Sequence, residues 1–478
     1  MTALSSRRTR LLLLLAVLAL AVALRLWGLG SWQWEEDELY TLRDSISLVL
    51  SGDGSPGIGA RPVYYLLQHA LLAVGDPTPL FLRLPAFVFG VLGVGAAWWL
   101  GRRAFGTVAG LVTALLVAVS PWHLQASQFA RYWTLVFLIA AVAITELPRA
   151  LDRGTPRRLL GALAIMLLGA LSHPTFLFPM IGALIGLSLV KPNGEWAIRW
   201  PTLRSWLLLW GPFVVILVGY YLIIKSGGHG NALRNSDGRG VVASLRLIPA
   251  MVQWAPLPIA GASALSLSFL LFVGRPGDRR YAVMSALGIV SGVVILYFSS
   301  IFTAVYADYG IAVLPLVYLA IGGAVQRVVD AVPPHMSPWV AGCAAAALGI
   351  AAAPGTVSHL IDGSRYDYRA AYAMIRDLAP DRPVVGGIET LQVAFEPSLE
   401  TRSLGAVRRK VPPLTGFWFV TSYQRYGLRE GGPRLAAWID TNCRRLSAWE
   451  RMRLDYRVYR VELHWCGTDP VPTPQGRE

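Results

Sequence analysis

Four consecutive carboxylates, Glu35 to Glu38, form the segment of this chain that is best suited to chemistry. They follow directly after an apolar stretch and lie among Trp32, Trp34 and Tyr40, aromatic residues typical of a membrane edge. Charge at such a position is costly unless it is used, so we expect the chemistry of this protein to involve this run. The alternative is that an acidic loop simply solvates the outer face.

Arginines at the predicted outer ends of later spans can supply the complementary positive charge. The usual bias of basic residues toward the cytoplasm does not explain Arg131, whose guanidinium can hold two phosphate oxygens at once. Arg61 and Arg83 carry the same expectation, and His173 can donate to a phosphate or an acceptor. The alternatives are that Arg131 reaches lipid headgroups, that Arg83 pairs with Asp76, and that His173 is an ordinary hydrogen-bonding residue at a helix start.

Other polar and aromatic residues are candidates for lining a substrate site: Tyr40, Tyr64, Tyr65, Tyr132 and Asp308. Tyrosines can stack on a sugar or line a lipid groove, although interfacial tyrosines also occur without any substrate. Asp308 can bind an acceptor or cap a helix.

The composition indicates a polytopic membrane protein. Hydrophobic residues make up 54% of the 478 residues and charged ones only 15%, the mean hydropathy is +0.49, and there are 17 tryptophans. The first span, Leu11 to Trp27, follows three arginines and could be a signal peptide, but no small-residue cleavage site follows it. We expect a retained helix. The net charge of +15 suits a basic rim against anionic lipid and requires no nucleic-acid partner.

Apolar stretches able to cross a hydrocarbon core about 30 Å thick recur about eleven times. They lie at 11–28, 81–100, 106–120, 129–148, 158–171, 174–190, 206–225, 257–274, 281–300, 309–328 and 337–353. With the N-terminus inside, every strongly basic loop falls on the cytoplasmic side, whereas the first outer loop, 29–80, is acidic. The acidic run is therefore predicted to face outward.

The composition changes after Ala353. We expect a transmembrane module at 1–354 and a small extracytoplasmic α/β domain at 355–478, with a helix at 367–378 and strands at 383–387, 416–420 and 456–461. Cys443 and Cys466 both fall in this domain and could pair in an oxidising compartment, or remain two reduced, half-buried thiols. Cys343 lies within a span.

Several common chemistries have no sequence support. The chain lacks a P-loop, a dinucleotide-binding glycine pattern, a nucleophile elbow and a zinc-helix motif. No cysteine or histidine spacing predicts a structural metal. We expect no required cofactor, although the carboxylate-rich loop leaves a divalent metal possible.

Six short segments together resemble the GT-C superfamily of integral-membrane glycosyltransferases. They are the acidic Asp37-Glu38 pair in the first outer loop, RPVYYLL at 61–67 followed by RLPA at 83–86, SPW at 120–122 followed by QFARY at 128–132, and SHPT at 172–175. The chain is most similar to transferases that use polyprenyl-phosphate sugars, such as protein O-mannosyltransferases and the aminoarabinose transferase of lipid A. Two positions depart from the family pattern: Arg61 stands where His is frequent, and Asp308 where Arg is frequent.

The resemblance implies that Asp37 is the catalytic base, that Glu38 assists or orients the loop, and that Arg131, Arg61, Arg83 and His173 bind the donor phosphate. The expected reaction is direct displacement at the anomeric carbon of a polyprenyl-phosphate sugar by a lipid, glycan or protein acceptor. The expected location is the inner membrane of a bacterium. A flippase or transporter of lipid-linked sugars and a polymerase of lipid-linked repeat units are the alternatives, although a transporter would usually show repeats with charges at mid-membrane.

Overall fold

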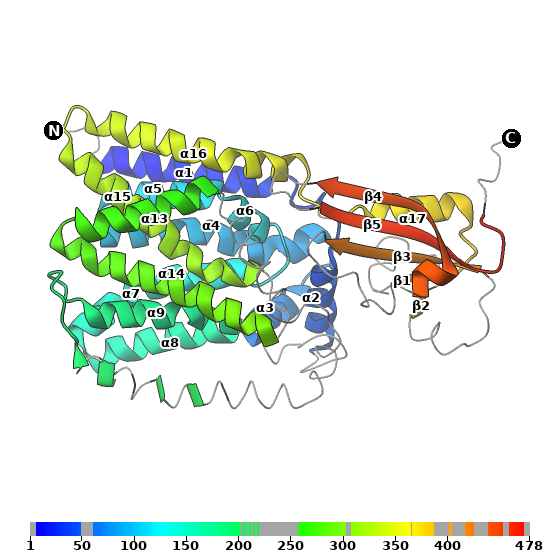
Figure 1. Cartoon of the computed structure of the whole chain (residues 1–478), viewed down its shortest axis with the longest axis horizontal. Coiled ribbons are helices and arrows are strands. Elements are labelled where there is room, and N and C mark those ends of the chain that lie inside the picture. Colours follow the sequence, from blue (N-terminus) through cyan, green and yellow to red (C-terminus); the bar gives the residue numbers. More distant parts are fainter. Residues whose placement is uncertain are drawn as a thin grey trace.

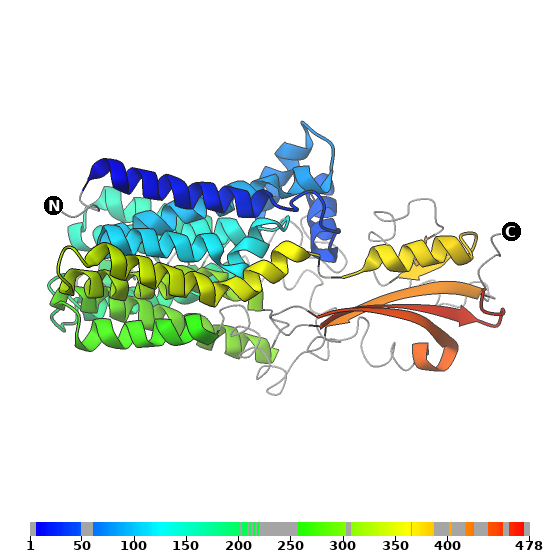
Figure 2. The same cartoon turned by 90° about the horizontal axis from the view of Figure 1, so that it is seen from above.

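The computed structural model describes residues 6–48, 61–200, 257–302, 307–364, 366–386, 401–403, 416–424, 438–452 and 458–472, with short pieces between 203 and 218. Figure 1 shows helices lying side by side along the long axis, with a smaller unit of strands and one helix beyond one end of the bundle. Figure 2 shows the same arrangement from above. The chain therefore has a helical module and a C-terminal α/β unit.

Long apolar segments form the helices of the bundle, because only internally hydrogen-bonded backbone is tolerated in hydrocarbon. The helices are α1 (Arg7–Leu26), α4 (Pro79–Ala104), α5 (Thr107–Val119), α6 (Pro121–Ser127), α7 (Trp133–Arg153), α8 (Pro156–Ser172), α9 (Leu177–Leu189), α13 (Leu257–Phe272), α14 (Pro276–Phe302), α15 (Leu314–Ala331) and α16 (Ser337–Ile361), with short 3-10 helices η3 (Pro174–Phe176) and η6 (Ala307–Val313).

Six helices in the described residues are long and apolar enough to cross a membrane, and α5 with α6, bent by 63°, provides a seventh if the pair is one span. Helices α8, α9 and α13 overlap predicted spans. With 17, 13 and 16 residues, each is shorter than any of those six helices. The predicted span 206–225 falls largely outside the described residues. A polytopic membrane protein is thus the observed class, and eleven crossings stay a prediction.

Close backbone contact joins α9 to α14. A Cβ atom on Gly182 would lie 2.0 Å from the carbonyl oxygen of Leu287, and one on Gly186 would lie 2.7 Å from the Cα of Met284. Two glycines four residues apart therefore allow the helices to approach within a distance that larger residues would prevent, as in other membrane helix pairs.

Ion pairs join the basic connections at the end of the bundle away from the α/β unit. Asp152 at the end of α7 pairs with Arg280 at 2.7 Å and with Arg199 at 2.9 Å, and Asp278 pairs with Arg327 at 2.6 Å. These residues belong to the loops predicted to share one side of the membrane, so the structure brings that set of loops together.

The C-terminal unit consists of α17 (Tyr368–Leu378) packed on a five-stranded sheet (Figure 1). The strands are β1 (Val384–Gly386), β2 (Thr401–Ser403), β3 (Gly416–Gln424), β4 (Cys443–Met452) and β5 (Val458–Gly467). Their order is β2-β1-β3-β5-β4, with β1 parallel to β2 and β3, and β5 antiparallel to β3 and β4. A buried cluster that includes Tyr372, Trp418 and Trp465 forms the core between helix and sheet.

The predicted helix and three predicted strands coincide with α17, β1, β3 and β5. Asp367 caps α17 by accepting a hydrogen bond from the backbone N–H of Ala370. Strand β4 was not predicted, because its charged residues obscure the alternation that marks a strand. Cys443 and Cys466 lie opposite each other on β4 and β5 and form a disulfide.

Candidate functional site

The candidate site lies at the end of the bundle nearest the α/β unit. The predicted first outer loop contains two helices, α2 (Glu36–Ser47) and α3 (Pro62–Leu72), which lie at that end in Figures 1 and 2. The segment between α6 and α7, the start of α4 and the junction of α8 with η3 reach the same end. Every predicted site residue comes from one of these connections or from η6.

Helix α2 begins inside the acidic run. The backbone N–H of Glu35, the N-cap residue, donates to Oε2 of Glu38 at 3.2 Å in a capping-box arrangement. Carboxylates in the first turn also suit the positive end of the helix dipole. Since adjacent residues on a helix point in different directions, Glu38 is fully buried whereas 49% of the Asp37 side chain remains exposed.

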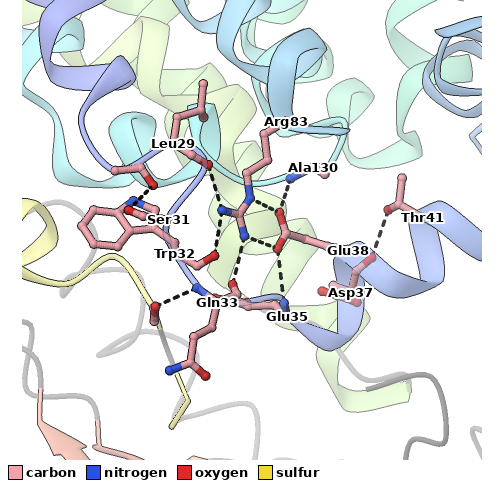
Figure 3. Close-up of polar contacts among 12 residues, drawn as sticks. Leu29, Ser31, Trp32, Gln33, Glu35, Asp37, Glu38, Thr41, Arg83 and Ala130 are labelled. Carbon is pink, nitrogen blue, oxygen red and sulfur yellow. Dashed lines mark hydrogen bonds and ion pairs between the residues drawn. The ribbon is translucent and has the colours of Figure 1, made fainter. Parts of the chain in front are cut away.

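Glu38 forms a buried, two-bond ion pair with Arg83 of α4 (Figure 3). Both hydrogen bonds measure 2.7 Å, and the exposed fractions of the side chains are 0% and 2%. The remaining N–H groups of Arg83 donate to the backbone carbonyls of Leu29, Trp32 and Gln33 at 2.9 to 3.2 Å. This one guanidinium thus holds the whole connection between α1 and α2.

The predicted phosphate-binding role of Arg83 does not fit this geometry, and of the roles expected for Glu38 only that of orienting the loop does. Arg83 has no N–H group left for a phosphate, because all five donate to protein oxygens. Its partner is Glu38 and not Asp76. Glu38 is enclosed and also accepts from the backbone N–H of Ala130 at 2.9 Å, so it orients the loop and is not placed to act on an acceptor.

Asp37 and Arg131 contact each other directly. Nη2 of Arg131 donates to a carboxylate oxygen of Asp37, and Nη1 donates to the hydroxyls of Tyr65 at 2.8 Å and Thr41 at 3.2 Å. Only 8% of the Arg131 side chain is exposed. The half-exposed carboxylate of Asp37 therefore lies at the surface of the site, and the buried guanidinium of Arg131 lies behind it.

Arg61 brings a second positive charge to this wall. Its guanidinium carbon lies 4.6 Å from the centre of the Tyr132 ring, and that of Arg131 lies 5.6 Å from the same ring. Across the residues that the structure describes, no carboxylate lies within ion-pair distance of Arg61, and the Nε atoms of both arginines are buried without a hydrogen-bond partner. Two cations thus face one carboxylate, a balance that favours an anionic ligand.

Aromatic rings enclose the two arginines. His173 stacks on Tyr132 with ring centres 4.9 Å apart, and Tyr309 lies 5.1 Å from His173. The other members of the enclosure are Tyr64, Tyr65 and Trp133. Sequence reasoning missed Trp133, which directly follows the QFARY segment, whereas Tyr309 had been noted only as the neighbour of Asp308.

Two predicted lining residues have other surroundings. Tyr40 lies against Arg43 of its own helix, with the guanidinium carbon 5.0 Å from the ring centre. Asp308 is only partly buried and lies in η6 next to Tyr309.

His173 is held as a neutral hydrogen-bond donor. Burial, together with the charges of Arg61 and Arg131, lowers the pKa of His173 well below its ordinary value. Its Nδ1 accepts from the backbone N–H of Thr175 at 3.3 Å, so the proton of the neutral ring is assigned to Nε2. The ring can therefore donate one hydrogen bond without adding charge.

A metal centre has no support in the described part of the chain, where no group of three or more His, Cys, Asp or Glu residues could hold an ion. Asp37 and Glu38 face different surroundings and do not converge. Metal-independent chemistry stays a prediction.

Known proteins resemble this chain in a stretch of sequence and in fold. Residues 57–223 match the family described as dolichyl-phosphate-mannose-protein mannosyltransferase. ArnT from Cupriavidus metallidurans in the apo state is similar in structure, with a TM-score of 0.54, 16% identity, and coverage of 95% of this chain and 97% of that chain. For the same protein bound to undecaprenyl phosphate the TM-score is 0.53 and the identity 15%, with coverage of 96% of this chain and 98% of that chain. No curated protein sequence matches the chain.

At these identities the likeness to ArnT shows a shared fold. Together with the family match, which includes Arg61, Arg131 and His173, it confirms the resemblance to the GT-C superfamily of membrane glycosyltransferases. The chain is a multi-pass membrane protein that shares its fold with ArnT.

The buried pair predicts a large loss of stability when Glu38 is changed. Glu38→Gln should destabilise the protein by about 3–5 kcal/mol, because Arg83 would be left buried without a counter-charge. Thermal unfolding in detergent measures the effect. Asp76→Asn, which changes an exposed acid of the same region, is the control and should unfold as the wild type does. Equal stability of the Glu38 variant and the control would contradict the assignment.

The surroundings of His173 predict a loss of stability at acidic pH. Because its folded pKa lies below the unfolded value of about 6.5, the unfolded chain binds more protons between these values, and stability falls as the pH decreases through that window. His173→Asn should flatten the dependence of the free energy of unfolding on pH below about 6.5, by up to about 1.4 kcal/mol per pH unit. The exposed His335→Asn should keep the wild-type slope. Identical slopes for the two variants would refute the expectation.

Proposed function

We propose that this protein transfers a sugar from a polyprenyl-phosphate donor to an acceptor hydroxyl at the outer face of the membrane. The observation that carries the proposal is the juxtaposition of one half-exposed carboxylate, Asp37, with two buried guanidiniums inside an aromatic enclosure. A phosphate diester carries one negative charge, and its sugar offers apolar ring faces to aromatic side chains. The site has complementary groups for both.

The reaction that this arrangement suits is a single displacement. The acceptor oxygen attacks the anomeric carbon while its proton passes to the carboxylate of Asp37, and the bond from that carbon to the phosphate oxygen breaks. Polyprenyl phosphate leaves with one more negative charge than the phosphate had in the donor. Arg131 and Arg61 are positioned to stabilise that developing charge, which is the main catalytic demand once the leaving group is good.

Arg131 would contact first the catalytic base, Asp37, and then the donor phosphate. In the described structure its Nη2 donates to Asp37. A donor phosphate that accepts hydrogen bonds from Arg131 would compete for this N–H, and the carboxylate would become available to an acceptor. The unpartnered Nε atoms of Arg61 and Arg131 offer further donors. His173 can add a neutral N–H to the phosphate or the acceptor.

The comparisons support a lipid-phosphate donor. The matched family is described as using dolichyl-phosphate mannose, and ArnT was solved bound to undecaprenyl phosphate. The sugar and the class of acceptor, whether lipid, glycan or protein, are left open. Transfer should need no cofactor, and addition of EDTA tests for a divalent metal.

The proposed location is the inner membrane of a bacterium, with the site and the C-terminal unit on the extracytoplasmic side. Basic loops collect at the opposite end of the bundle, as expected for a cytoplasmic face. The disulfide between Cys443 and Cys466 suits an oxidising compartment.

Loss of the base should abolish transfer. With purified protein, radiolabelled polyprenyl-phosphate sugars and membrane extract as the source of acceptors, Asp37→Asn should lower the rate by about 10²–10⁴, since the side chain keeps its shape but cannot accept the proton. Asp76→Asn is the matched control. Undiminished transfer by Asp37→Asn would remove the assignment. Movement of the donor across vesicle membranes without a new glycosidic bond would indicate a flippase, and products built only from the donor would indicate a polymerase.

Loss of Arg131 should act on the donor. Arg131→Ala should raise the donor concentration for half-maximal rate by about 10- to 100-fold, because a charged hydrogen bond contributes about 1.5–3 kcal/mol. The acceptor concentration for half-maximal rate should change far less. Arg103→Ala, an exposed arginine after the predicted span at 81–100, serves as the control. Donor titration in the same assay measures both quantities, and an unchanged donor requirement would count against phosphate binding.

A further inference from the structure

Gln33 lies between the bundle and the C-terminal unit and makes three hydrogen bonds to the segment that begins α17. Its backbone N–H donates to the hydroxyl of Ser364 at 3.0 Å, and its Nε2 donates to Oδ1 of Asp367 at 3.3 Å. Its Oε1 accepts from the backbone N–H of Arg369 at 3.2 Å. Gln33 is 6% exposed, so solvent cannot readily replace these partners.

Apolar contacts join the same two parts. Leu39 of α2 belongs to the buried cluster between α17 and the sheet, and Trp34 packs against that cluster from the α1–α2 connection. The C-terminal unit therefore contacts α2 on one side while the bundle contacts it on the other.

On the bundle side, Gln33 is connected to the acidic run. Its carbonyl oxygen accepts from Nη2 of Arg83 at 2.9 Å, and the same guanidinium holds Glu38 (Figure 3). Glu38 immediately precedes Leu39 and follows Asp37. A continuous set of buried contacts thus runs from α17 through Gln33 and Arg83 to the helix that carries Asp37.

We propose that Gln33 is a positioning residue through which the C-terminal α/β unit holds α2, and with it Asp37, against the donor site. This inference rests on the proposed function of Asp37. The residue type follows from the contacts: an amide both donates to the Asp367 carboxylate and accepts from a backbone N–H, which neither a carboxylate nor an apolar side chain does. The C-terminal unit is then part of the catalytic assembly.

The activity test separates positioning from donor binding. Gln33→Glu places two carboxylates together and should lower the maximal transfer rate about tenfold or more, while the donor requirement, governed by Arg61 and Arg131, changes less than about twofold. Asp367→Asn combined with Gln33→Glu should recover most of the rate, since the amide of the second variant can donate to the carboxylate of the first. Asp381→Asn, in the exposed turn after α17, is the control.

Recovery in the double variant distinguishes the Gln33–Asp367 contact from a general loss of folding, which a second substitution would not repair. A Gln33→Glu variant with the wild-type maximal rate, or a double variant no better than the single one, would overturn the proposal.

A second measurement does not depend on transfer. Amide hydrogen exchange in α2, measured on the full-length protein in detergent, should be faster in Gln33→Glu than in the wild type and should slow again in the double variant. Unchanged exchange would refute the positioning role. If the wild-type protein transfers no sugar but the exchange follows this pattern, the proposed function fails while the structural coupling stands.

Discussion

The buried pair of Glu38 and Arg83 is the interaction on which the site depends. Two charges removed from water are stable only if every donor and acceptor is used, and this pair meets that condition through three backbone carbonyls and the N–H of Ala130. The consequence is geometric. The pair joins the α1–α2 connection, the start of α4 and the segment before α7 at one point. Asp37 is next to Glu38 and Arg131 is next to Ala130, so the same contacts bring Asp37 and Arg131 together.

The site combines one neutralised region with one left positively charged. Glu38 and Arg83 compensate each other, whereas within the described residues Arg131 pairs only with Asp37 and Arg61 pairs with no carboxylate. Aromatic rings around the latter pair exclude water and provide polarisable faces for both cations. Burial, together with the same excess of positive charge, lowers the pKa of His173 and keeps it neutral. The enclosure is therefore prepared for a ligand that brings its own negative charge, and the C-terminal unit fixes α2 from the other side through Gln33.

Much of this architecture could be predicted from local sequence. Apolar stretches determine where helices lie, since hydrocarbon admits little else, and the basic residues of alternate loops indicated which connections share a side. The acidic run and Arg131 were recognisable because charge at a membrane edge is unusual. Strand β4 was not recognisable, because its charged residues mask the alternation of a strand and its pairing with β5 is visible only in the structure. Because adjacent residues on a helix point in different directions, Asp37 and Glu38 were also expected to face apart.

Sequence alone determined the class of protein, the residues able to carry charge at the end of the bundle nearest the C-terminal unit, and the two cysteines available to pair. Tertiary structure decided which of those charges are paired within the protein and which are left for a ligand. Arg61, Arg83 and Arg131 had comparable standing as phosphate ligands, and only the packing of α4 against the α1–α2 connection shows that Arg83 is already fully occupied. Likewise Gln33 carries no sequence signal. The physical reason is that hydropathy is a property of a segment, whereas the satisfaction of a buried charge or amide depends on partners contributed by distant parts of the chain.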